Sequence, residues 1–287
     1  MVDLHAHSDR SDGELPPEEL VELAHRRGLA ALAITDHDSV EGYDAAAPHA
    51  RRLGLEFICG VELNSKFRGR SIHILGYFLD RPPGDEFRSH LSCLQKARRE
   101  RNQRLTKRLQ ELGLSVRLEE AEALGRSQTG RPHFAHLLVR KGYASGMRDA
   151  FDRYLDERAP GYVERRDPSL ENVLRWIREA GGLSSWAHPA RFIREGDPTA
   201  EKMVRELAAT GLNAIEAFHS DHSPEDAERF RRIAESLRLG TTGGSDFHGP
   251  NRSRAALGSL NLPDSLLGNL RAYSRQVFSG DAEPKRG

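Results

Sequence analysis

Short apolar runs alternate with amphipathic, helix-like segments along most of the chain. Five times a segment with helical periodicity reaches a glycine, an apolar run of strand length follows, and the run ends at a residue that can bind metal. The five stretches are LVELAHRRGLAALAITDHD, ARRLGLEFICGVEL, IREAGGLSSWAHP, LAATGLNAIEAF and AESLRLGTTGGSDFH. This repeated order of helix, turn and strand is typical of parallel sheets that are covered by helices.

Helix start signals agree with this pattern. Pro16 and Pro17 precede EELVELA, Ser169 precedes LENVLRWI, and Ser223 with Pro224 precedes EDAERFRRIA. An opening strand near VDLHAH and the apolar run SIHILGYFL bring the expected total to about seven strands. The pattern therefore favours an α/β fold with a parallel, barrel-like sheet.

The barrel rhythm stops between about residues 86 and 165. The stretch FRSHLSCLQKARRERNQRLTKRLQELG instead has leucines at helical spacing. Because 287 residues suffice for one large core, we expect a barrel from residues 1–85 and 166–287, with a helical cap domain from 86–165 inserted over the site. The basic run from Lys96 to Arg108 has two interpretations, a solvated helix face or a contact for a nucleic-acid backbone.

Composition excludes several classes of function. The 43 basic and 43 acidic residues give no net charge, so long duplex nucleic acid is not an expected partner and a small substrate or short oligomer is. Cys59 and Cys93 stand in unrelated contexts and predict neither disulfides nor a cysteine metal site. With neither a signal-like segment nor a bilayer-spanning apolar run, the sequence predicts a cytoplasmic protein without a membrane partner. It carries no signal for the oligomeric state.

Residues that can bind metal gather at the predicted strand ends. His5 and His7 lie two positions apart in VDLHAH, so on a strand both point to the same face. In α/β barrels the C-terminal strand ends form the active site. The candidates are six histidines and three carboxylates: His5, His7, Asp12, His37, Glu62, His73, His188, Asp246 and His248. Nine ligands exceed the needs of one ion, and this mixture suits manganese, iron or zinc, so we expect two or three divalent ions, with Mn²⁺ first and Fe²⁺ or Zn²⁺ as alternatives.

The motifs HAHSDRSDG, ITDHD, GVE, IHILGY, AHPAR and GSDFH resemble, in this order, those of the PHP family, named for polymerase and histidinol phosphatase. The resemblance implies a distorted (β/α)7 barrel, similar to a TIM barrel, whose trinuclear metal centre hydrolyses phosphoesters. It assigns His5, His7, Glu62 and Asp246 to one ion, Asp12, His37 and His248 to a second, and Glu62, His73 and His188 to a third.

The resemblance also implies roles around the ions. Catalysis is expected to depend on five of the ligands: Asp12, His37, Glu62, Asp246 and His248. Asp36 and Asp38 flank His37, and we expect them to orient imidazoles by hydrogen bonds. No protein nucleophile is required, and the sequence contains no GxSxG, P-loop or GxGxxG motif.

The stretch GRPHFAHLLVRKGYASGMRDAFDRYL is similar to the PHP subgroup that removes the 3′-phosphate from 3′,5′-bisphosphonucleotides, leaving 5′-mononucleotides and phosphate. Some members also act as 5′-to-3′ exonucleases on short RNA. The similarity implies that Arg131 and His133 in the cap bind the nucleoside bisphosphate or short RNA substrate. A structural ion pair for Arg131 and a helix cap for His133 are the alternatives. His136 stands where the subgroup often has arginine.

Three other functions stay open. A histidinol-phosphate phosphatase shares the metal-binding residues but is not expected to carry this cap sequence. A metal-dependent amidohydrolase can also begin with HxH, but it typically has a lysine at a mid-barrel strand end, where this chain has Glu62 and His73. A non-catalytic PHP module beside a polymerase would not need a complete ligand set.

Overall fold

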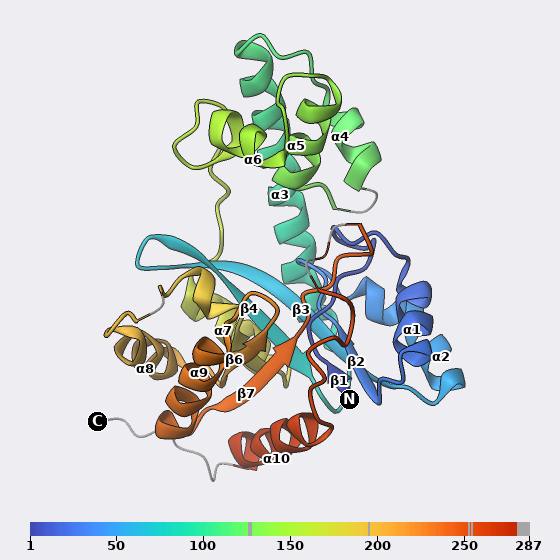
Figure 1. The fold of residues 1–287 in the computed structure, drawn as a ribbon, viewed down its shortest axis with the longest axis vertical. Helices are drawn as coiled ribbons and strands as arrows, with labels where there is room; N and C mark the ends of the chain where they lie inside the picture. The colour runs from blue at the N-terminus through green and yellow to red at the C-terminus, as the bar shows by residue number, and fades with distance from the viewer. Residues whose placement is uncertain (126–127, 195, 252, 254, 280–287) are drawn as a thin grey trace.

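The computed structural model describes residues 1–279 except 126–127, 195, 252 and 254 (Figure 1). Residues 280–287, the end of the second predicted barrel segment, lie outside this description. One seven-stranded sheet forms the centre, with its strands in sequence order. The strands are β1 (Val2–Asp3), β2 (Ala31–Ile34), β3 (Glu56–Phe67), β4 (Arg70–Phe78), β5 (Leu183–Trp186), β6 (Ala214–His219) and β7 (Gly240–Gly244).

The sheet curls into a nearly closed barrel. Next to the first strand, the N–H of Leu4 donates to the carbonyl of Gly243 at 3.1 Å, across the seam between the two edge strands. A parallel bridge between Ala6 and Phe247 continues this seam. The α/β, distorted seven-stranded barrel expected from the sequence is confirmed.

The expectation of a parallel sheet is wrong at β4, which pairs antiparallel with both β3 and β5. Only Arg68 and Gly69 separate β3 from β4, with φ angles of 50° and 75°. A two-residue turn of this kind can join antiparallel strands but cannot provide the long crossover that a parallel pair requires. The pairs β1–β2, β2–β3, β5–β6 and β6–β7 are parallel.

Helices cover the outside of the barrel: α1 (Pro17–Arg26), α2 (Glu41–Leu53), α7 (Leu170–Glu179), α8 (Ala200–Thr210), α9 (Pro224–Leu237) and α10 (Ser265–Ser279). The 3-10 turn η2 (Pro189–Arg191) directly follows His188 after β5. The predicted start signals are confirmed, since Pro17 begins α1 and the hydroxyls of Ser169 and Ser223 accept backbone N–H groups at 3.3 and 3.0 Å. Helix α10 lies across the end of the barrel away from the helical insertion (Figure 1).

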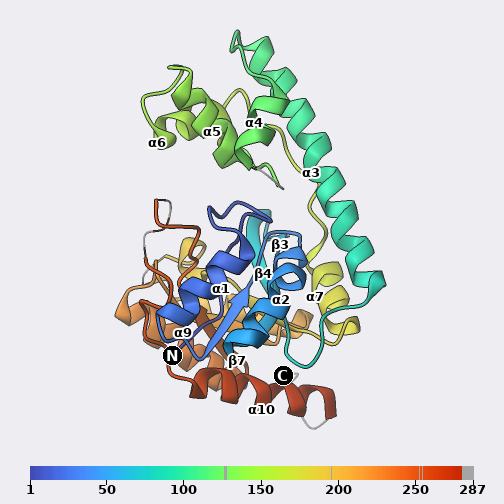
Figure 2. The same ribbon diagram turned by 90° about the vertical axis from the view of Figure 1, so that its right-hand side faces the viewer.

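The insertion consists of α3 (Asp85–Glu111), α4 (Leu118–Gly125), α5 (Arg131–Arg140), α6 (Met147–Ala150) and the π-helical turn η1 (Phe151–Leu155). Helix α3 belongs to two cores. Phe87 and Leu91 pack with the barrel, whereas Leu105 and Leu109 pack in a separate core with Phe134. Figure 2 shows α3 rising from the side of the barrel to α4–α6, which we call the cap.

The domain boundaries at residues 86 and 165 stay a prediction. No helix within the described ranges has both the length and the apolar composition needed to cross a bilayer.

Candidate metal centre

The nine predicted ligands come from six segments of the barrel and meet at one end of it. They follow or lie on these strands: His5, His7 and Asp12 after β1, His37 after β2, Glu62 on β3, His73 on β4, His188 after β5, and Asp246 with His248 after β7. Convergence of side chains from successive strand ends is how barrels of this type form an active site. The strand-end rhythm in the sequence therefore located the cluster correctly.

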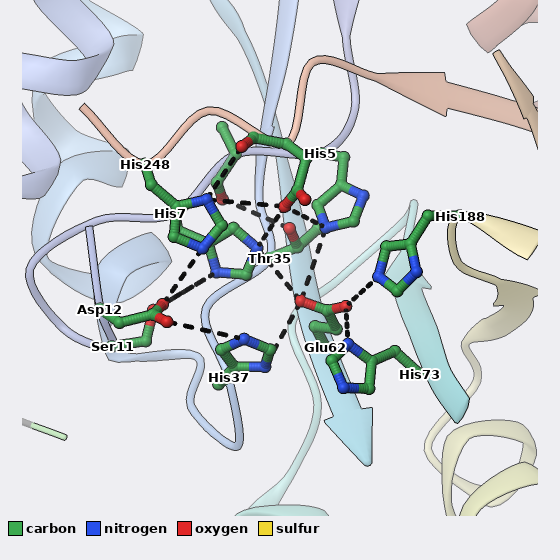
Figure 3. A network of polar contacts seen from close by, with 12 residues as sticks. His5, His7, Ser11, Asp12, Thr35, His37, Glu62, His73, His188 and His248 are labelled. Atoms are coloured by element: carbon green, nitrogen blue, oxygen red, sulfur yellow. Dashed lines mark hydrogen bonds and ion pairs between the residues drawn. The ribbon is translucent and has the colours of Figure 1, made fainter. Parts of the chain in front are cut away.

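Glu62 lies at the centre of the cluster and is 1% exposed (Figure 3). Three imidazole nitrogens lie near its Oε2: His7 Nε2 at 3.1 Å, His37 Nδ1 at 3.4 Å and His5 Nε2 at 3.5 Å. Two others lie near its Oε1: His73 Nδ1 at 2.6 Å and His188 Nε2 at 3.1 Å. Because its two oxygens face different imidazoles, this carboxylate could serve more than one ion.

Two aspartates complete the cluster. The Oδ1 atom of Asp246 lies 3.3 Å from the Nε2 atoms of both His5 and His7. Asp12 lies 3.4 Å from His248 Nε2 and 3.9 Å from His37 Nε2.

Four groups place their ligand atoms within 4.8 Å of one another in the described chain: His5, His7, Glu62 and Asp246; His7, Asp12, His37 and His248; His37, Glu62 and His73; and His5, Glu216 and His219. The first group equals the set that the PHP resemblance assigns to one ion.

The donor atoms fit divalent cations. His5 Nε2, His7 Nε2 and His37 Nδ1 are buried and have no hydrogen-bond partner among the described residues. Buried polar atoms in proteins are normally paired, so three such nitrogens directed at one carboxylate fit a site that holds a cation. Mixed imidazole and carboxylate donors suit zinc, manganese or iron.

The pKa shifts of the histidines in the cluster also favour a bound cation. Burial disfavours a charged imidazole, yet Asp246 and Glu62 beside His7 raise its pKa to about 10. Burial lowers the pKa of His37 to about 3. The carboxylates thus draw a proton onto one imidazole while another stays neutral, and a bound cation would replace that proton.

Glu216 on β6 was missed from the sequence. It is fully buried; its Oε1 accepts a hydrogen bond from His5 Nδ1 at 2.9 Å, and its Oε2 accepts the N–H of His188 at 2.7 Å. This leaves His5 Nε2 facing Glu62, an arrangement that commonly orients metal-binding histidines. The signal was present, because a glutamate within the apolar run NAIEAF is unusual for a buried strand.

His219 and Arg191 were also missed. His219 Nε2 lies 3.4 Å from Asp246 Oδ2, and Arg191 donates to the same oxygen at 2.8 Å. Both contacts fall on Oδ2, so Oδ1 of Asp246 is left facing His5 and His7. The sequence around these two residues did not show that their side chains would contact Asp246, which follows a different strand of the barrel, β7.

Strained backbone surrounds the centre. Asp38, His188 and Asp246 have φ angles of 50°, 32° and 54°, in the left-handed region that residues other than glycine rarely adopt. Such conformations persist only where surrounding contacts hold them, and they cluster at functional sites. For His188 one of these contacts is the hydrogen bond from its N–H to Glu216.

Asp36 and Asp38 do not have the partners expected from the sequence. Asp36 accepts hydrogen bonds from the N–H and hydroxyl of Ser8 at 2.8 and 2.6 Å and from the Ser11 hydroxyl at 2.6 Å. Asp38 accepts hydrogen bonds from Arg98 and Arg165 at 2.6 and 2.9 Å. Asp36 therefore holds the loop after β1, and Asp38 connects the barrel to arginines beneath the cap.

A cleft lies between the metal cluster and the cap. Its barrel side includes Asp12, His37 and His73, and its other side includes the predicted Arg131. Arg131 Nη1 donates to the carbonyl of Leu155 at 3.3 Å, and the guanidinium carbon lies 5.7 Å from the centre of the Tyr162 ring.

His133 has a different position from the one expected of a substrate contact. It is 1% exposed and is absent from the described lining of the cleft. Its Nδ1 accepts the N–H of Gly130 at 3.0 Å, at the start of α5. This contact favours the helix-cap alternative for His133. His136 is exposed on the same helix.

Comparison with known proteins places these features in context. The PHP domain family model matches residues 3–164. The chain is 34% identical over 259 residues to a 3′,5′-nucleoside bisphosphate phosphatase from Chromobacterium violaceum, covering 90% of each protein. It is 32% identical over 265 residues to a 5′-3′ exoribonuclease from Haemophilus influenzae, covering 92% of this chain and 96% of that one.

A third relative has a different named activity. The chain is 35% identical over 258 residues to a phosphoribosyl 1,2-cyclic phosphate 1,2-diphosphodiesterase from Eggerthella lenta, covering 86% of this chain and 94% of that one. Among solved structures, a protein from Bifidobacterium adolescentis assigned as a metal-dependent phosphoesterase superposes with a TM-score of 0.83 at 30% identity, covering 95% of this chain and 96% of that one.

Proposed function

The chain belongs to the PHP domain family, and from this we propose that it is a metal-dependent phosphoesterase that removes the 3′-phosphate from 3′,5′-bisphosphonucleotides. The products are a 5′-mononucleotide and phosphate. The observation that carries the proposal is a cleft with a metal-ligand cluster on one side and arginines on the other. A substrate with two phosphates needs both. The similarity to the bisphosphate phosphatase supports the same substrate.

We assign the nine candidate ligands to two or three divalent ions, with Mn²⁺ expected first and Fe²⁺ or Zn²⁺ as alternatives. When bound, the ions activate water for attack on phosphorus and neutralise charge on the phosphate oxygens. The chain's own part is positional. Glu62 holds five imidazoles around one point, and Glu216 keeps His5 turned toward it.

The substrate reaches the cluster from the cap side. Asp12, His37 and His73 line the cleft, whereas Glu62 beneath them is 1% exposed. A phosphate that enters the cleft therefore meets metal ligands on one side and Arg131 on the other. Arginine suits this second contact because its planar donors match phosphate oxygens.

Short RNA is the second candidate substrate, with cleavage from the 5′ end. The similarity to the H. influenzae exoribonuclease favours it, and a 5′-terminal nucleotide also carries two phosphates close to one sugar. The relative from E. lenta makes cyclic phosphodiesters a necessary comparison in any substrate screen.

Metal content provides the first test. Protein purified without chelator is expected to contain two or three transition-metal ions per chain, because the ligand groups exceed what one ion can use. Elemental analysis measures the ratio. Chelation should abolish hydrolysis, and added Mn²⁺ should restore it. Fewer than one ion per chain, with no activity restored by Mn²⁺, would contradict the assignment.

Substrate preference provides the second test. We expect a higher kcat/KM for 3′,5′-bisphosphonucleotides than for 5′-mononucleotides or histidinol phosphate. Arg131→Ala should raise KM for the bisphosphate about tenfold to a hundredfold, because a hydrogen bond to a charged group contributes about 1.5–3 kcal/mol. An aryl phosphate should be hydrolysed normally by this variant, since it has no second phosphate.

Arg140→Ala is the matched control, because Arg140 is exposed at the other end of α5. An equal loss on both substrates would make Arg131 a structural residue. If histidinol phosphate were the best substrate, the nucleotide assignment would be wrong while the metal chemistry would stand.

A further inference from the structure

The basic run from Lys96 to Arg108 has members on more than one side of α3. Arg98 and Arg101 line the cleft above the metal cluster. A second hollow, which we call the α3 groove, has among its lining residues Arg10 after β1, Lys96, Arg98, Arg99 and Asn102 on α3, and Gln128 before α5. Part of the basic run therefore faces a concave surface and not only open solvent.

The α3 groove is continuous with the cleft. Arg98 and Gln128 line both of them. In the loop after β1, Arg10 lines the groove, whereas Ser11 and Asp12 line the cleft. Because Asp12 is a candidate metal ligand, the groove begins two residues from the metal cluster along this loop. A strand of nucleotides with one phosphate at the metal ligands can continue past Arg10 into the groove.

Two cations of the groove have little compensation from the protein. Lys96 is exposed and makes no hydrogen bond and no ion pair with another described residue. Arg10 has its Nε 3.9 Å from a carboxylate oxygen of Asp9, which is beyond hydrogen-bond distance, and this Nε is buried without a hydrogen-bond partner. Both side chains can therefore bind phosphate oxygens without first breaking a hydrogen bond of their own.

The acidic side chains of the groove are Glu41 and Glu122. Glu122 already accepts a hydrogen bond from Arg99 at 2.9 Å. The groove thus has four basic side chains against two acidic ones, and one of the acidic ones is neutralised within the groove itself. This balance suits a ligand with negative charge spread along its length.

The wall of the cleft beside the β3–β4 hairpin has the opposite balance. Its cations are already paired, since Lys66 contacts Glu164 and Arg165 contacts Asp167. Glu157 and Asp167 also line this cleft. A polyanion that leaves the metal cluster therefore finds unpaired cations on the α3 side and paired ones on the hairpin side.

Two buried amides of the groove have unused hydrogen-bonding atoms. Asn102 is 2% exposed; its Nδ2 donates to the carbonyl of Thr129 at 2.8 Å, but its Oδ1 is buried without a partner. Gln128 is 9% exposed, and neither polar atom of its amide has a hydrogen-bond partner within the described chain. Buried polar atoms are normally paired, so these amides fit a polar ligand. Ribose hydroxyls and base edges offer matching donors and acceptors.

We propose that the α3 groove binds the part of a short RNA strand that lies on the 3′ side of the cleaved bond. This inference rests on the proposed function and adds to it a surface that only an oligonucleotide reaches. Cleavage breaks the bond between phosphorus and O3′ of the first nucleotide. The oxygen of water stays on phosphorus, and a proton goes to O3′. The released mononucleotide leaves the cleft, and the remaining strand, with a new 5′-phosphate, lies in the groove.

Substrate length provides the first test. On a 5′-phosphorylated tetraribonucleotide, Lys96→Ala should lose kcat/KM about tenfold, the loss expected for one hydrogen bond to a charged group. It should keep the kcat/KM of the unchanged protein on adenosine 3′,5′-bisphosphate, which does not reach the groove. Arg10→Ala should show the same selectivity. Lys107→Ala is the matched control and should change neither value, because Lys107 is exposed in the same basic run and absent from the described lining of both hollows.

Salt dependence provides a readout that does not require catalysis. The ligand is a tetranucleotide with a methylene group in place of O3′ in its first linkage, which cannot be cleaved there. Fluorescence anisotropy measures its binding to the metal-loaded protein at several salt concentrations. One lost contact to a single-stranded backbone lowers the slope of log K against log salt by about 0.7. Lys96→Ala should show this decrease, and Lys107→Ala should not.

The outcomes separate the groove from the proposed function. Equal kinetics and equal salt slopes for Lys96→Ala and Lys107→Ala would show that the run is a solvated helix face, and would overturn the groove while leaving the hydrolysis intact. Equal losses on the tetranucleotide and on the bisphosphonucleotide would also overturn it, because Lys96 would then act on the cleft. A salt slope that depends on Lys96, in a protein that hydrolyses neither substrate, would support the groove and contradict the proposed function.

Discussion

Glu62→Ala is expected to lower kcat for phosphoester hydrolysis by more than about 100-fold and to reduce the metal content at more than one position. Loss of a residue that only orients a metal ligand typically costs 10–100-fold in affinity or activity. Glu62 should cost more, because its two oxygens face five imidazole nitrogens at 2.6 to 3.5 Å. Removing it leaves those imidazoles without their shared carboxylate.

Metal analysis and steady-state kinetics on the same preparations measure both effects. Glu62→Gln keeps the size of the side chain and removes its charge, so it separates loss of the ligand from loss of packing. Glu235→Ala is the control, because this side chain is 73% exposed on α9. Near-normal turnover with full metal content in Glu62→Ala would contradict the central role assigned to this residue.

Asp38→Ala is expected to reduce the free energy of unfolding by about 3–5 kcal/mol, the cost of leaving a buried ion pair without one partner. Asp38 is fully buried, and the side chains of Arg98 and Arg165 that donate to it are 13% and 10% exposed. Without the carboxylate, two largely buried guanidiniums lose their shared counter-charge. The same contacts connect the barrel to α3, so the substitution should also loosen the cap.

The full loss of unfolding free energy in Asp38→Ala should be observed at neutral pH. Burial alone would raise the pKa of Asp38, but Arg98 and Arg165 hold it well below its usual range. A carboxylate with a depressed folded-state pKa stabilises the protein above its unfolded pKa of about 3.9, and this stability is lost as the pH falls through the folded pKa. The difference between Asp38→Ala and the unchanged protein should therefore be constant above about pH 5.

Urea denaturation at pH 7 measures the difference. Asp44→Ala is the matched control, because Asp44 pairs with Arg88 at the surface, where both side chains are 33% or more exposed, and such pairs contribute less than about 1 kcal/mol. Equal effects of the two substitutions would show that the Asp38 cluster does not stabilise the fold.

The sequence by itself determined where the cluster of candidate metal ligands lies. Most predicted ligands stand at the end of an apolar run or on the loop after it, whereas His73 lies inside one, and the order of strands in a barrel brings such ends together. His5 and His7 could be paired from their spacing, because alternate residues of an extended segment share a face; β1 itself ends at Asp3, and the bridge between Ala6 and Phe247 lies between the two histidines. The helix starts at Ser169 and Ser223 could also be predicted from the local sequence, since a capping hydroxyl bonds only to a backbone N–H in the first turn of its own helix.

The tertiary structure decided how charged groups are distributed around that centre. Arg101 is buried and Arg104 is exposed although both stand in the same basic run, because their burial depends on how α3 packs against the rest of the protein. In the sequence, Glu216 is only a single acidic residue in an apolar run. The structure shows that β6 places its carboxylate beside His5. His133 was expected to face the substrate, and only the start of α5 shows its ring bonded to Gly130. Spacing along a chain specifies which residues share a face of a helix or strand. The burial of a charged side chain and its hydrogen-bond and ion-pair partners depend instead on segments far apart in sequence. Burial and partners together determine how much free energy a charged group costs or contributes.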